Sequence, residues 1–392
     1  MEQPHLWSKN FIIVFLSNLA SFLAFHMLVP ILPVYIINIG GGDVAVGLVS
    51  TAFSVSAILI RFIVGKSLDT IGRKAVLYAG LFITMAAIIG YPLVSIVTMV
   101  ICIRFIHGFG WGMTSTAFNT IASDIIPKTR LAEGLGFFGM TVSLAMALAP
   151  SVAFYFYYQS GFLQVIVIAT LLCLLSMILP FYLKLGKTNQ IKLLAGNIFK
   201  WENIIDKDGI SPSLLIVLVA LTQGGVINFV ALFGVQNGIS NVGSFFFCNA
   251  MMALFVRSFA GRLQDQKGPT IIIIPSYISM MAGVLLLSFS TNQFLLIGSG
   301  LLYGLGQGAV TPAIQTLLIS RTSTERRGVA IAMYMSAIDI GMACGGLVLG
   351  YVASLTNYIF MYRISAIFPA LGIVLFSYFW LKQKNKQRMI GS

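Results

Sequence analysis

The chain has 392 residues, of which 58% are hydrophobic and only 9% charged, and its formal net charge is +13. A soluble globular domain carries about a quarter charged residues, so this composition excludes a soluble fold and indicates an integral membrane protein. The excess of lysine and arginine lies in short segments between apolar runs, which favours membrane orientation over nucleic-acid binding as its cause.

Apolar runs of the length that crosses a bilayer, about 20 residues, recur along the whole chain. We expect spanning helices near 11–36, 45–65, 74–92, 95–122, 133–157 and 162–184 and, after a polar break, near 211–235, 240–261, 270–290, 294–319, 328–354 and 358–381. The predicted fold is an all-α membrane protein with twelve transmembrane helices in two pseudo-symmetric six-helix bundles. The N-terminal bundle would cover 1–186, a cytoplasmic linker 187–210 and the C-terminal bundle 211–392. A short amphipathic helix is expected within the linker.

Lysine and arginine alternate between successive loops. Both termini, the linker and every second loop carry them, whereas the loops in between carry none. By the positive-inside rule, this alternation places both termini and the linker in the cytoplasm. The predicted location is the cell (cytoplasmic) membrane, which the chain crosses many times.

An internal repeat relates the two bundles. Arg61, Gly65, Asp69 and Gly72 each have an identical residue 196 positions later (257 − 61 = 196). The same interval relates glycines at 108, 110 and 112 to glycines at 304, 306 and 308. Parallel repeats of this kind are the architecture of one large class of transporters. The stretch 65–74 is interpreted as a charged, glycine-bounded turn between the second and third helices.

The motifs resemble those of the major facilitator superfamily over the whole chain. The stretch 65–74 is similar to the family's loop between helices two and three, and 261–268 is similar to its degenerate second copy. Residues 104–108 resemble the helix-four motif, with His107 where glutamine is usual. In helix five, the series Gly136, Ala145, Ala149-Pro150 and Ala153 resembles the glycine series of drug antiporters. The resemblance implies a twelve-helix transporter of the drug:proton antiporter-like branch.

The resemblance also implies a gate at the cytoplasmic face. In this gate Asp69 would cap a helix end and join a charge network with Arg73 and Arg130. A solvated turn that fits its glycines is the alternative. Arg61 and Arg257, one turn from these loops, are expected to reach the membrane interface. The candidate gate residues are Gly65, Asp69, Gly72, Arg73, Lys74, Arg130 and Asp265.

Few ionisable side chains lie inside the predicted helices, and in a membrane such groups mark functional sites or paired charges. Asp339 lies near a helix midpoint, where a carboxyl can bind and release a proton as its access to water changes. The resemblance assigns Arg104, which shares a helix face with His107, to proton transfer. We therefore expect proton coupling at Asp339, Arg104 and His107, with structural hydrogen bonds or ion pairs as the alternative. The sequence leaves open whether His26, His107 or Asp339 takes the proton.

Polar and aromatic side chains on several helices are candidates for substrate contact. His26 precedes Pro30 and Pro33, which can bend helix one, although a hydrogen-bonded histidine of the bundle interior is the alternative. The candidate substrate-cavity residues are Asn18, Phe22, His26, Trp111, Gln223, Tyr303 and Gln307.

The sequence thus predicts a secondary active transporter, not an enzyme, that exports small amphiphilic organic compounds in exchange for protons by alternating access. Its partners would be the small-molecule substrate, protons and the lipid bilayer, without nucleic acid, cofactor or metal, and it would act as a monomer. A transporter of a specific metabolite, such as a sugar, siderophore or metallophore, is the main alternative. A membrane-embedded lipid enzyme is the remote one, because that chemistry needs clustered His, Asp or Glu side chains near the interface.

Overall fold

The computed structural model describes residues 6–41, 43–184, 205–239 and 241–390. This part of the chain consists of helices joined by short connections, and 12 of the helices are long and apolar enough to cross a membrane. They begin and end close to the predicted bounds, so the expected all-α architecture with twelve spans is confirmed. Contacts divide the chain into two compact units, which are described separately.

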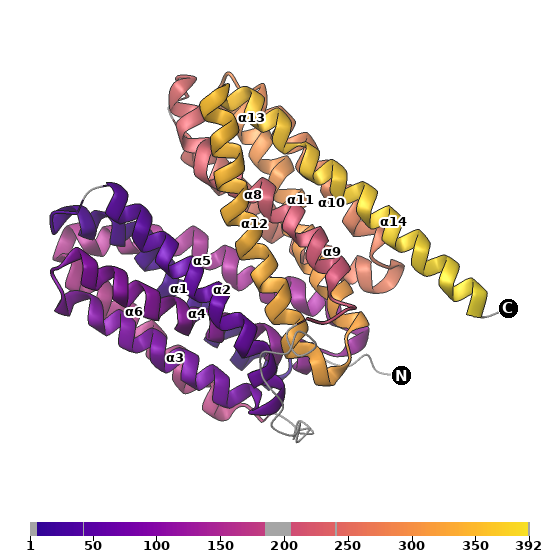
Figure 1. Cartoon of the computed structure of the whole chain (residues 1–392), viewed down its shortest axis with the longest axis horizontal. Coiled ribbons are helices and arrows are strands. Elements are labelled where there is room, and N and C mark those ends of the chain that lie inside the picture. The colour runs from indigo at the N-terminus through magenta and orange to yellow at the C-terminus, as the bar shows by residue number, and fades with distance from the viewer. Residues whose placement is uncertain (1–5, 42, 185–204, 240, 391–392) are drawn as a thin grey trace. The chain divides into compact units, whose positions relative to one another are not determined.

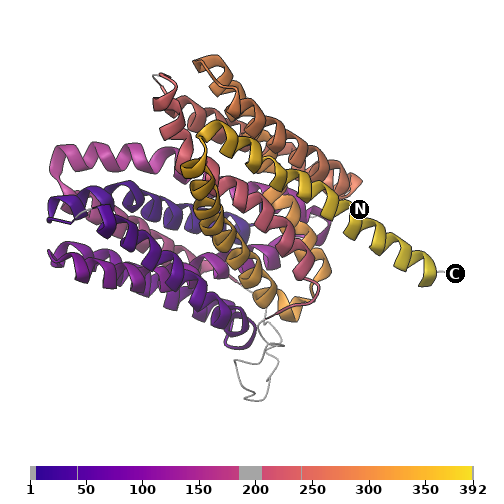
Figure 2. The same ribbon diagram turned by 45° about the horizontal axis from the view of Figure 1, so that its top comes forward.

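Unit 1 comprises Met1–Lys128, Phe138–Asp206 and Thr322–Met335. Its N-terminal helices, indigo to magenta in Figures 1 and 2, lie side by side as a bundle, in which α2 and α3 pack against α4, and α1 packs against α6. The helices that lie wholly or partly in unit 1 are α1 (Lys9–Asn38), α2 (Asp43–Thr70), α3 (Arg73–Gly90), η1 (Tyr91–Leu93), α4 (Val97–Ile125), η2 (Lys128–Arg130), α5 (Leu131–Ser160), α6 (Phe162–Ile178), η3 (Leu179–Tyr182), η4 (Thr324–Arg326) and the first turns of α12 (Arg327–Leu355).

Unit 2 comprises Thr129–Phe137, Lys207–Arg321 and Ser336–Ser392. Within it, α9 and α10 pack against α11, and α14 packs against α8 and α10. Besides the first turns of α5 and the remainder of α12, it contains α8 (Ile210–Gln236), α9 (Gly243–Lys267), α10 (Thr270–Ser288), α11 (Gln293–Arg321), α13 (Tyr358–Ser365) and α14 (Ile367–Ile390). The last predicted span is therefore two consecutive helices, α13 and α14.

Each unit includes a short segment from the opposite half of the sequence. Residues 129–137 belong to unit 2 and residues 322–335 to unit 1. These segments contain the N-terminal ends of α5 and α12. The expected domain boundaries around 187–210 remain a prediction. Most of that linker, including the expected amphipathic helix, falls in 185–204, outside the described residues.

The stretch 65–74 is mostly helix and not turn. α2 continues to Thr70 and α3 begins at Arg73, so the connection between them is very short. Gly72 has a φ of 115°, a backbone conformation that favours glycine. The expected helix end at residue 65 was wrong because Gly65 and the polar residues after it end the apolar run without ending the helix. Gly268, with a φ of 88°, follows α9 in the same way.

Glycines of α4 allow it to pack closely against α2. A side chain on Gly108 would overlap the Ser56 hydroxyl and the carbonyl oxygen of Phe53. The repeat reproduces this contact, since a side chain on Gly304 of α11 would overlap the backbone of Asn249 on α9. These repeated glycines are therefore positions where two helix backbones approach closely.

The substitution Gly108→Ala should lower the thermal stability of the purified protein, because its methyl group would force α4 away from α2. Overpacking of a close contact costs about 1–3 kcal/mol. Gly298→Ala is the matched control, since its Cβ would lie 3.4 Å from the nearest atom outside its own helix, Cδ2 of Leu286. Thermal denaturation in detergent should separate the two variants. Equal melting temperatures would contradict the close packing of α4 on α2.

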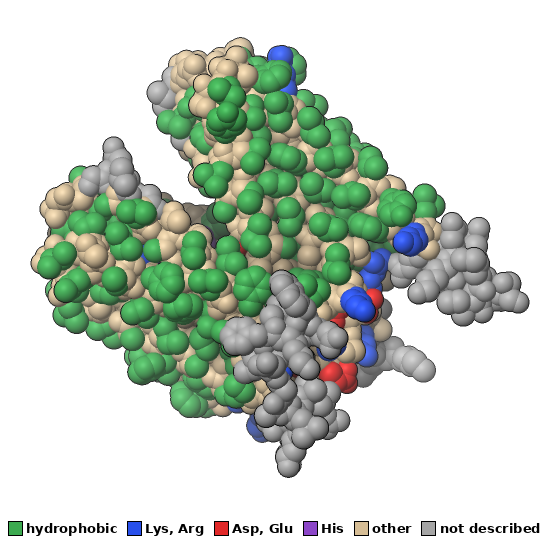
Figure 3. All heavy atoms as spheres, viewed as in Figure 1, with side chains coloured by type: hydrophobic (Ala, Val, Ile, Leu, Met, Phe, Trp, Pro, Cys, Tyr) green, Lys and Arg blue, Asp and Glu red, His purple; other side chains and the backbone are tan. Residues whose placement is uncertain are grey.

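Apolar side chains cover most of the visible flank of each unit in the space-filling view (Figure 3). Large exposed residues include Phe82 on α3, Leu171 on α6 and Phe255 on α9. Continuous apolar surface of this extent is rare on soluble proteins, and it suits contact with lipid tails. The chain is a multi-pass membrane protein.

Candidate functional site

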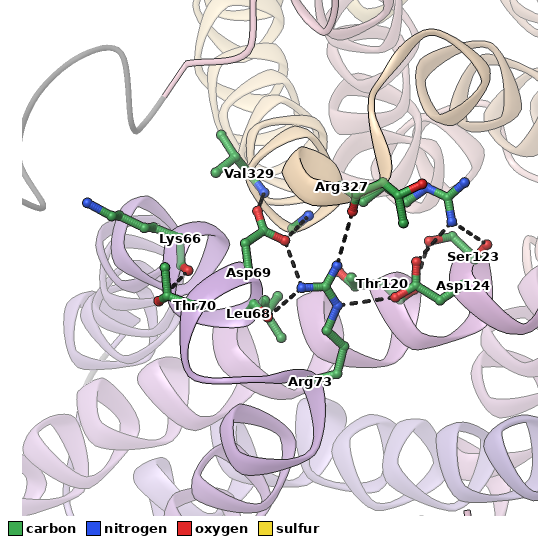
Figure 4. Close-up of polar contacts among 12 residues, drawn as sticks. Lys66, Leu68, Asp69, Thr70, Arg73, Thr120, Ser123, Asp124, Arg327 and Val329 are labelled. Carbon is green, nitrogen blue, oxygen red and sulfur yellow. Dashed lines mark hydrogen bonds and ion pairs between the residues drawn. The ribbon is translucent and has the colours of Figure 1, made fainter. Parts of the chain in front are cut away.

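Asp69, in the last turn of α2, holds the N-terminal end of α12. Its carboxylate accepts hydrogen bonds from the backbone amides of Gly328 (3.0 Å) and Val329 (3.2 Å), as Figure 4 shows for Val329. The first amides of a helix lack acceptors within the helix and carry partial positive charge, so a carboxylate stabilises that end. All three residues lie in unit 1. We call this arrangement the Asp69 clasp.

Arg73 connects the Asp69 clasp to two further charges. Its guanidinium lies 2.8 Å from Asp69 and 3.1 Å from Asp124 (Figure 4). Asp124 in turn contacts Arg327, the first residue of α12, at 2.9 Å. Acidic and basic groups therefore alternate through a largely buried network, where salt screens ion pairs less than at the surface. The sequence analysis missed Asp124 and Arg327, although both are charges at helix ends.

A second clasp is built in the same way inside unit 2. The carboxylate of Asp265 accepts hydrogen bonds from the backbone amides of Ala132 and Glu133, both at 3.0 Å, at the start of α5. Each of its three residues lies 196 positions from its counterpart in the Asp69 clasp (265 − 69 = 196). We call it the Asp265 clasp. The repeat that the sequence revealed is thus also a repeated contact.

The two clasps differ in charge. Pro269 occupies the position that corresponds to Arg73, so the arginine that contacts Asp69 has no equivalent at that position beside Asp265. At the Asp265 clasp the nearby ion pair lies on the capped helix end itself, where Arg130 contacts Glu133 at 2.7 Å. The Asp69 clasp is therefore the one whose carboxylate takes part directly in an ion pair with an arginine of the next helix.

The other glycine and lysine candidates lie near the Asp69 clasp without joining its charges. Gly65 packs against the start of α12, where a Cβ would lie 2.8 Å from Cα of Val329. Lys74 donates a hydrogen bond to the carbonyl oxygen of Leu183 at 2.6 Å. Gly65 therefore serves close packing, and Lys74 ties the start of α3 to the end of η3.

Two expectations about arginines need correction. Arg130 was expected to join the Asp69 network, but it belongs to unit 2 and pairs there on the first turn of α5. Arg61 was expected to reach the membrane interface, but it is 2% exposed. It donates hydrogen bonds to the Ser115 hydroxyl and the Met335 carbonyl oxygen, each at 3.1 Å. These acceptors inside unit 1 remove the need to reach water. Its repeat counterpart, Arg257, is buried as well.

A buried arginine–histidine pair lies on α4. Arg104 is 6% exposed and His107 is 0% exposed. Nη1 of Arg104 lies 3.4 Å from Nδ1 of His107, and the hydroxyl of Tyr91 lies 3.0 Å from the same nitrogen. An arginine only donates hydrogen bonds, so Nδ1 is the acceptor, and the ring hydrogen of the neutral imidazole lies on Nε2. The guanidinium of Arg104 and the hydroxyl of Tyr91 therefore both donate to Nδ1 of His107.

Aromatic rings surround this pair. The guanidinium carbon of Arg104 lies 4.2 Å from the ring centre of Phe53 and 5.7 Å from that of Phe25, within the range of cation–π attraction. Phe25 in turn stacks on Trp111 with 4.0 Å between ring centres. We call the following residues the Arg104 cluster: Phe25, Phe53, Tyr91, Arg104, His107 and Trp111.

The Arg104 cluster offers positive charge, hydrogen-bond donors and aromatic surface. Among the described residues of unit 1, no carboxylate forms an ion pair with Arg104. Neither Nε of Arg104 nor Nε2 of His107 has a hydrogen-bond partner. Two buried donors of the cluster therefore lack an acceptor in this structure.

Three residues predicted for substrate contact lie on α1 in the same unit. Phe22 packs edge-on against Trp111 with 4.7 Å between ring centres, and His26 lies beside Phe22 at 6.1 Å. Asn18 is buried and donates to the Thr141 hydroxyl at 2.7 Å, which makes it a structural hydrogen bond between α1 and α5. The structure thus brings Phe22, His26 and Trp111 together and gives Asn18 a different contact.

Phe25, Phe53 and Tyr91 were not predicted. The chain contains 30 phenylalanines and 14 tyrosines, and the helix-four motif marks residues of one helix only. Which rings of α1 and α2 face Arg104 depends on helix packing. The one available signal was that Phe25 directly precedes His26.

The remaining predicted residues belong to unit 2. Gln223 on α8 and Gln307 on α11 are half-buried, and Tyr303 is buried with no partner for its hydroxyl. Asp339 is half-buried in the interior of α12. The residues expected to carry proton coupling are thus divided between the two units. Among the described residues, no group of three His, Cys, Asp or Glu side chains is placed to hold a metal ion.

Comparison with known families gives the class of the protein. The model of the Major Facilitator Superfamily matches residues 14–289 and, separately, residues 213–390. The chain belongs to the major facilitator superfamily. Its members bind and transport small molecules, so the predicted class, a transporter and not an enzyme, is confirmed.

Several curated relatives align with the chain over most of their length. The chain is 27% identical over 382 residues to an uncharacterized MFS-type transporter of Methanocaldococcus jannaschii, covering 93% of this chain and 97% of that protein. It is 24% identical over 369 residues to a multi-drug resistance efflux pump PmrA homolog of Lactococcus lactis, covering 90% of each. Identity to the staphylopine export protein of Staphylococcus aureus is 20% over 369 residues, covering 90% and 92%.

A solved transporter structure has the same fold. The human organic anion transporter MFSD10 superposes with a TM-score of 0.79 at 18% identity, covering 95% of this chain and 100% of that one. At such low identity the likeness establishes the fold alone. It agrees with the superfamily assignment from the sequence.

Proposed function

We propose that this protein exports small amphiphilic organic compounds from the cytoplasm in exchange for protons. It would act as a monomer in the cell membrane with both termini in the cytoplasm. Two bundles, 1–186 and 211–392, joined by the linker 187–210, would alternate access to a midplane site. The observation that carries the proposal is the Arg104 cluster, since a buried cation among aromatic rings suits a compound with an apolar body and one polar group.

Export is the direction that two relatives suggest. One is named as a multi-drug resistance efflux pump homolog and another as a staphylopine export protein, and each aligns with 90% of this chain. The alternation of lysine and arginine between loops supports cytoplasmic termini. The names of the two relatives favour extrusion from the cytoplasm.

The proposed roles follow the position of each residue. Asp339 would carry the coupling proton, because it is the acidic residue in the interior of a described helix, whereas the others lie at helix ends, in connections or outside the described residues. The Arg104 cluster would contact the substrate, with His107 available for proton exchange. Gln223, Tyr303 and Gln307 would line the pathway in unit 2.

The two clasps are proposed to close the cytoplasmic side. A carboxylate at a helix N-terminus contributes typically about 0.3–1 kcal/mol when exposed and up to about 2 kcal/mol when partly buried. Contacts of this strength can be broken and remade in each transport cycle. The Asp69 clasp would open as the start of α12 moves away from α2. The Asp265 clasp would open as the start of α5 moves away from α9.

Export of one specific metabolite is the second candidate. The alignment with the staphylopine export protein favours it, because that protein is named for a single exported compound. A narrow substrate range in a transport assay would support this candidate, and acceptance of several unrelated amphiphiles would exclude it.

Transport driven by a pH gradient tests the proposal. Purified protein in proteoliposomes with an acidic lumen should accumulate amphiphilic dyes in the lumen, because protons leave as the compound enters. A protonophore should abolish the accumulation. Symport would expel the compound under the same gradient, and accumulation that persists with the protonophore would contradict proton coupling.

A further inference from the structure

We propose that the Arg104 cluster binds the anionic group of the transported compound, so that the substrate is an organic anion, such as a carboxylate, with an apolar or aromatic body. This inference rests on the proposed transport function and names the chemical class of its substrate. It assigns Arg104 to substrate recognition and leaves the coupling proton to Asp339.

The first argument is the missing counter-ion. Arg104 is 6% exposed, and the described residues of unit 1 place no carboxylate in an ion pair with it. Burying a charge without a partner is strongly unfavourable. The rings of Phe53 and Phe25 compensate only in part, because cation–π attraction is weaker than a close ion pair. An anion from a bound compound would complete the compensation.

The second argument is the chemistry of the atoms that lack partners. Nε of Arg104 and Nε2 of His107 are buried without hydrogen-bond partners. Nε of arginine is always a donor, and Nε2 of His107 is a donor because Nδ1 accepts from Arg104. Both unsatisfied groups in the Arg104 cluster therefore require an acceptor. A carboxylate provides two acceptor oxygens and matches the planar guanidinium.

The third argument comes from the internal repeat, which provides a built-in comparison. At the positions 196 residues after Arg104 and His107, unit 2 has Gly300 and Tyr303, neither of them charged at neutral pH. α11 packs against α9 there without an arginine, and Gly300 instead allows close contact with Phe245. The bundle geometry therefore does not require a cation at this position, which favours a role in recognition for Arg104.

The aromatic side of the cluster provides the surface for the apolar body. Phe25 is only partly buried and stacks on Trp111 at 4.0 Å between ring centres. Phe22 packs edge-on against the same indole, with 4.7 Å between the ring centres of Phe22 and Trp111. A compound with a ring or chain next to its carboxylate could contact these rings while its anionic group reaches Arg104.

Fluorescence of Trp111 tests this inference directly. We would use a variant in which Trp111 is the sole tryptophan, with phenylalanine at positions 7, 201 and 380, in lipid nanodiscs. The probes are phenylacetate, phenylacetamide and phenethylammonium, together with octanoate, octanamide and octylammonium, so that each apolar body occurs with three head groups. Each carboxylate should bind at least about tenfold more tightly than its amide, and each ammonium compound should bind most weakly.

The substitution Arg104→Gln should reduce carboxylate binding to the level of the amide and leave amide binding unchanged. Arg104→Lys keeps the positive charge but cannot form a bidentate hydrogen bond, so it should give an intermediate preference for carboxylate over amide. Arg363→Gln is the matched control, because Arg363 is exposed on α13 in unit 2 and has its own ring contact, with Phe289 at 4.9 Å. It should retain the full head-group preference, and melting curves would verify that each variant is folded.

Three results would overturn the inference: equal binding of carboxylate and amide by the sole-tryptophan protein, an unchanged preference in Arg104→Gln, or no binding of any probe. The pH-gradient assay distinguishes failure of this inference from failure of the proposed transport function. Proton-driven transport of uncharged or cationic compounds would preserve the transport function and exclude anion recognition. A carboxylate preference without proton-driven transport would support anion recognition and exclude the proposed transport function.

Discussion

Replacing Asp69 with asparagine is expected to increase the open fraction of the Asp69 clasp by about 10- to 100-fold. Asparagine has one acceptor oxygen, so one of the amides of Gly328 and Val329 loses its partner, and the ion pair with Arg73 disappears. Loss of a hydrogen bond to a charged group costs about 1.5–3 kcal/mol, and each 1.36 kcal/mol changes an equilibrium about tenfold. The start of α12 should therefore separate from α2 more often.

Labelling of a buried thiol measures this opening. Leu68 is 0% exposed and lies against the start of α12, so Leu68→Cys in a background without the four native cysteines reports when the clasp opens. A maleimide should react with it much faster when Asp69→Asn is added. Glu325→Gln removes an exposed carboxylate nearby and should leave the rate unchanged. The same rate in all three proteins would show that Asp69 does not hold the helix end.

Removing the carboxyl of Asp339 is expected to remove the contribution of the coupling proton to the driving force of transport. One proton that crosses 100 mV contributes about 2.3 kcal/mol, which corresponds to a roughly 50-fold accumulation of substrate. Asp339→Asn should lose this factor, whereas Asp339→Glu should keep part of it because the carboxyl remains. The maximum accumulation ratio in proteoliposomes, with an imposed potential and pH gradient, measures the difference.

The control for Asp339→Asn is Asp208→Asn, which removes an exposed acidic group just before α8. It should accumulate substrate as the wild type does. Normal proton-driven accumulation by Asp339→Asn would remove Asp339 from the mechanism. His107→Gln and His26→Gln would then identify which of the two histidines takes the proton.

Hydropathy and the repeat were sufficient to predict the architecture, because both depend on residues that are adjacent or evenly spaced in the sequence. Twelve apolar segments predict twelve spans, since a helix in lipid must satisfy its own backbone hydrogen bonds. The ends of the helices were predicted less accurately. The polar residues that follow Gly65 stop the apolar run, yet α2 continues to Thr70 because Asp69 and its neighbours find partners within unit 1.

The sequence also identified Asp69 and Asp265 as candidate gate residues, but it could not identify the groups that they contact. The amides that Asp69 contacts lie about 260 residues later in the chain, and backbone amides carry no sequence signal. The same limit applies to Arg61, whose acceptors are the Ser115 hydroxyl and the backbone oxygen of Met335. Side-chain type predicts that a charge needs a partner, whereas packing decides which partner it meets.

The Arg104 cluster shows both the value and the limit of motif reasoning. The resemblance in helix four singled out Arg104 and His107, and the structure places them 3.4 Å apart. The rings of Phe25 and Phe53 come from α1 and α2, and apart from the position of Phe25 beside His26, no pattern in the sequence distinguishes them from the other phenylalanines. Composition suggests that an aromatic lining is possible, but only tertiary packing selects its members.

The exchange of short segments between the two units has a consequence for biosynthesis. While the ribosome is still translating the first half, Asp69 and Arg73 are already made, but the helix end that Asp69 caps has not been synthesised. Domains generally fold in order as they emerge, yet this one remains incomplete until residues 322–335 follow. A truncated chain that ends before residue 322 should therefore leave the carboxylate of Asp69 without its two amide donors and Arg73 without the carbonyl acceptor of Thr324, and the incomplete unit should be degraded by quality-control proteases. Co-expression of the missing half should rescue it.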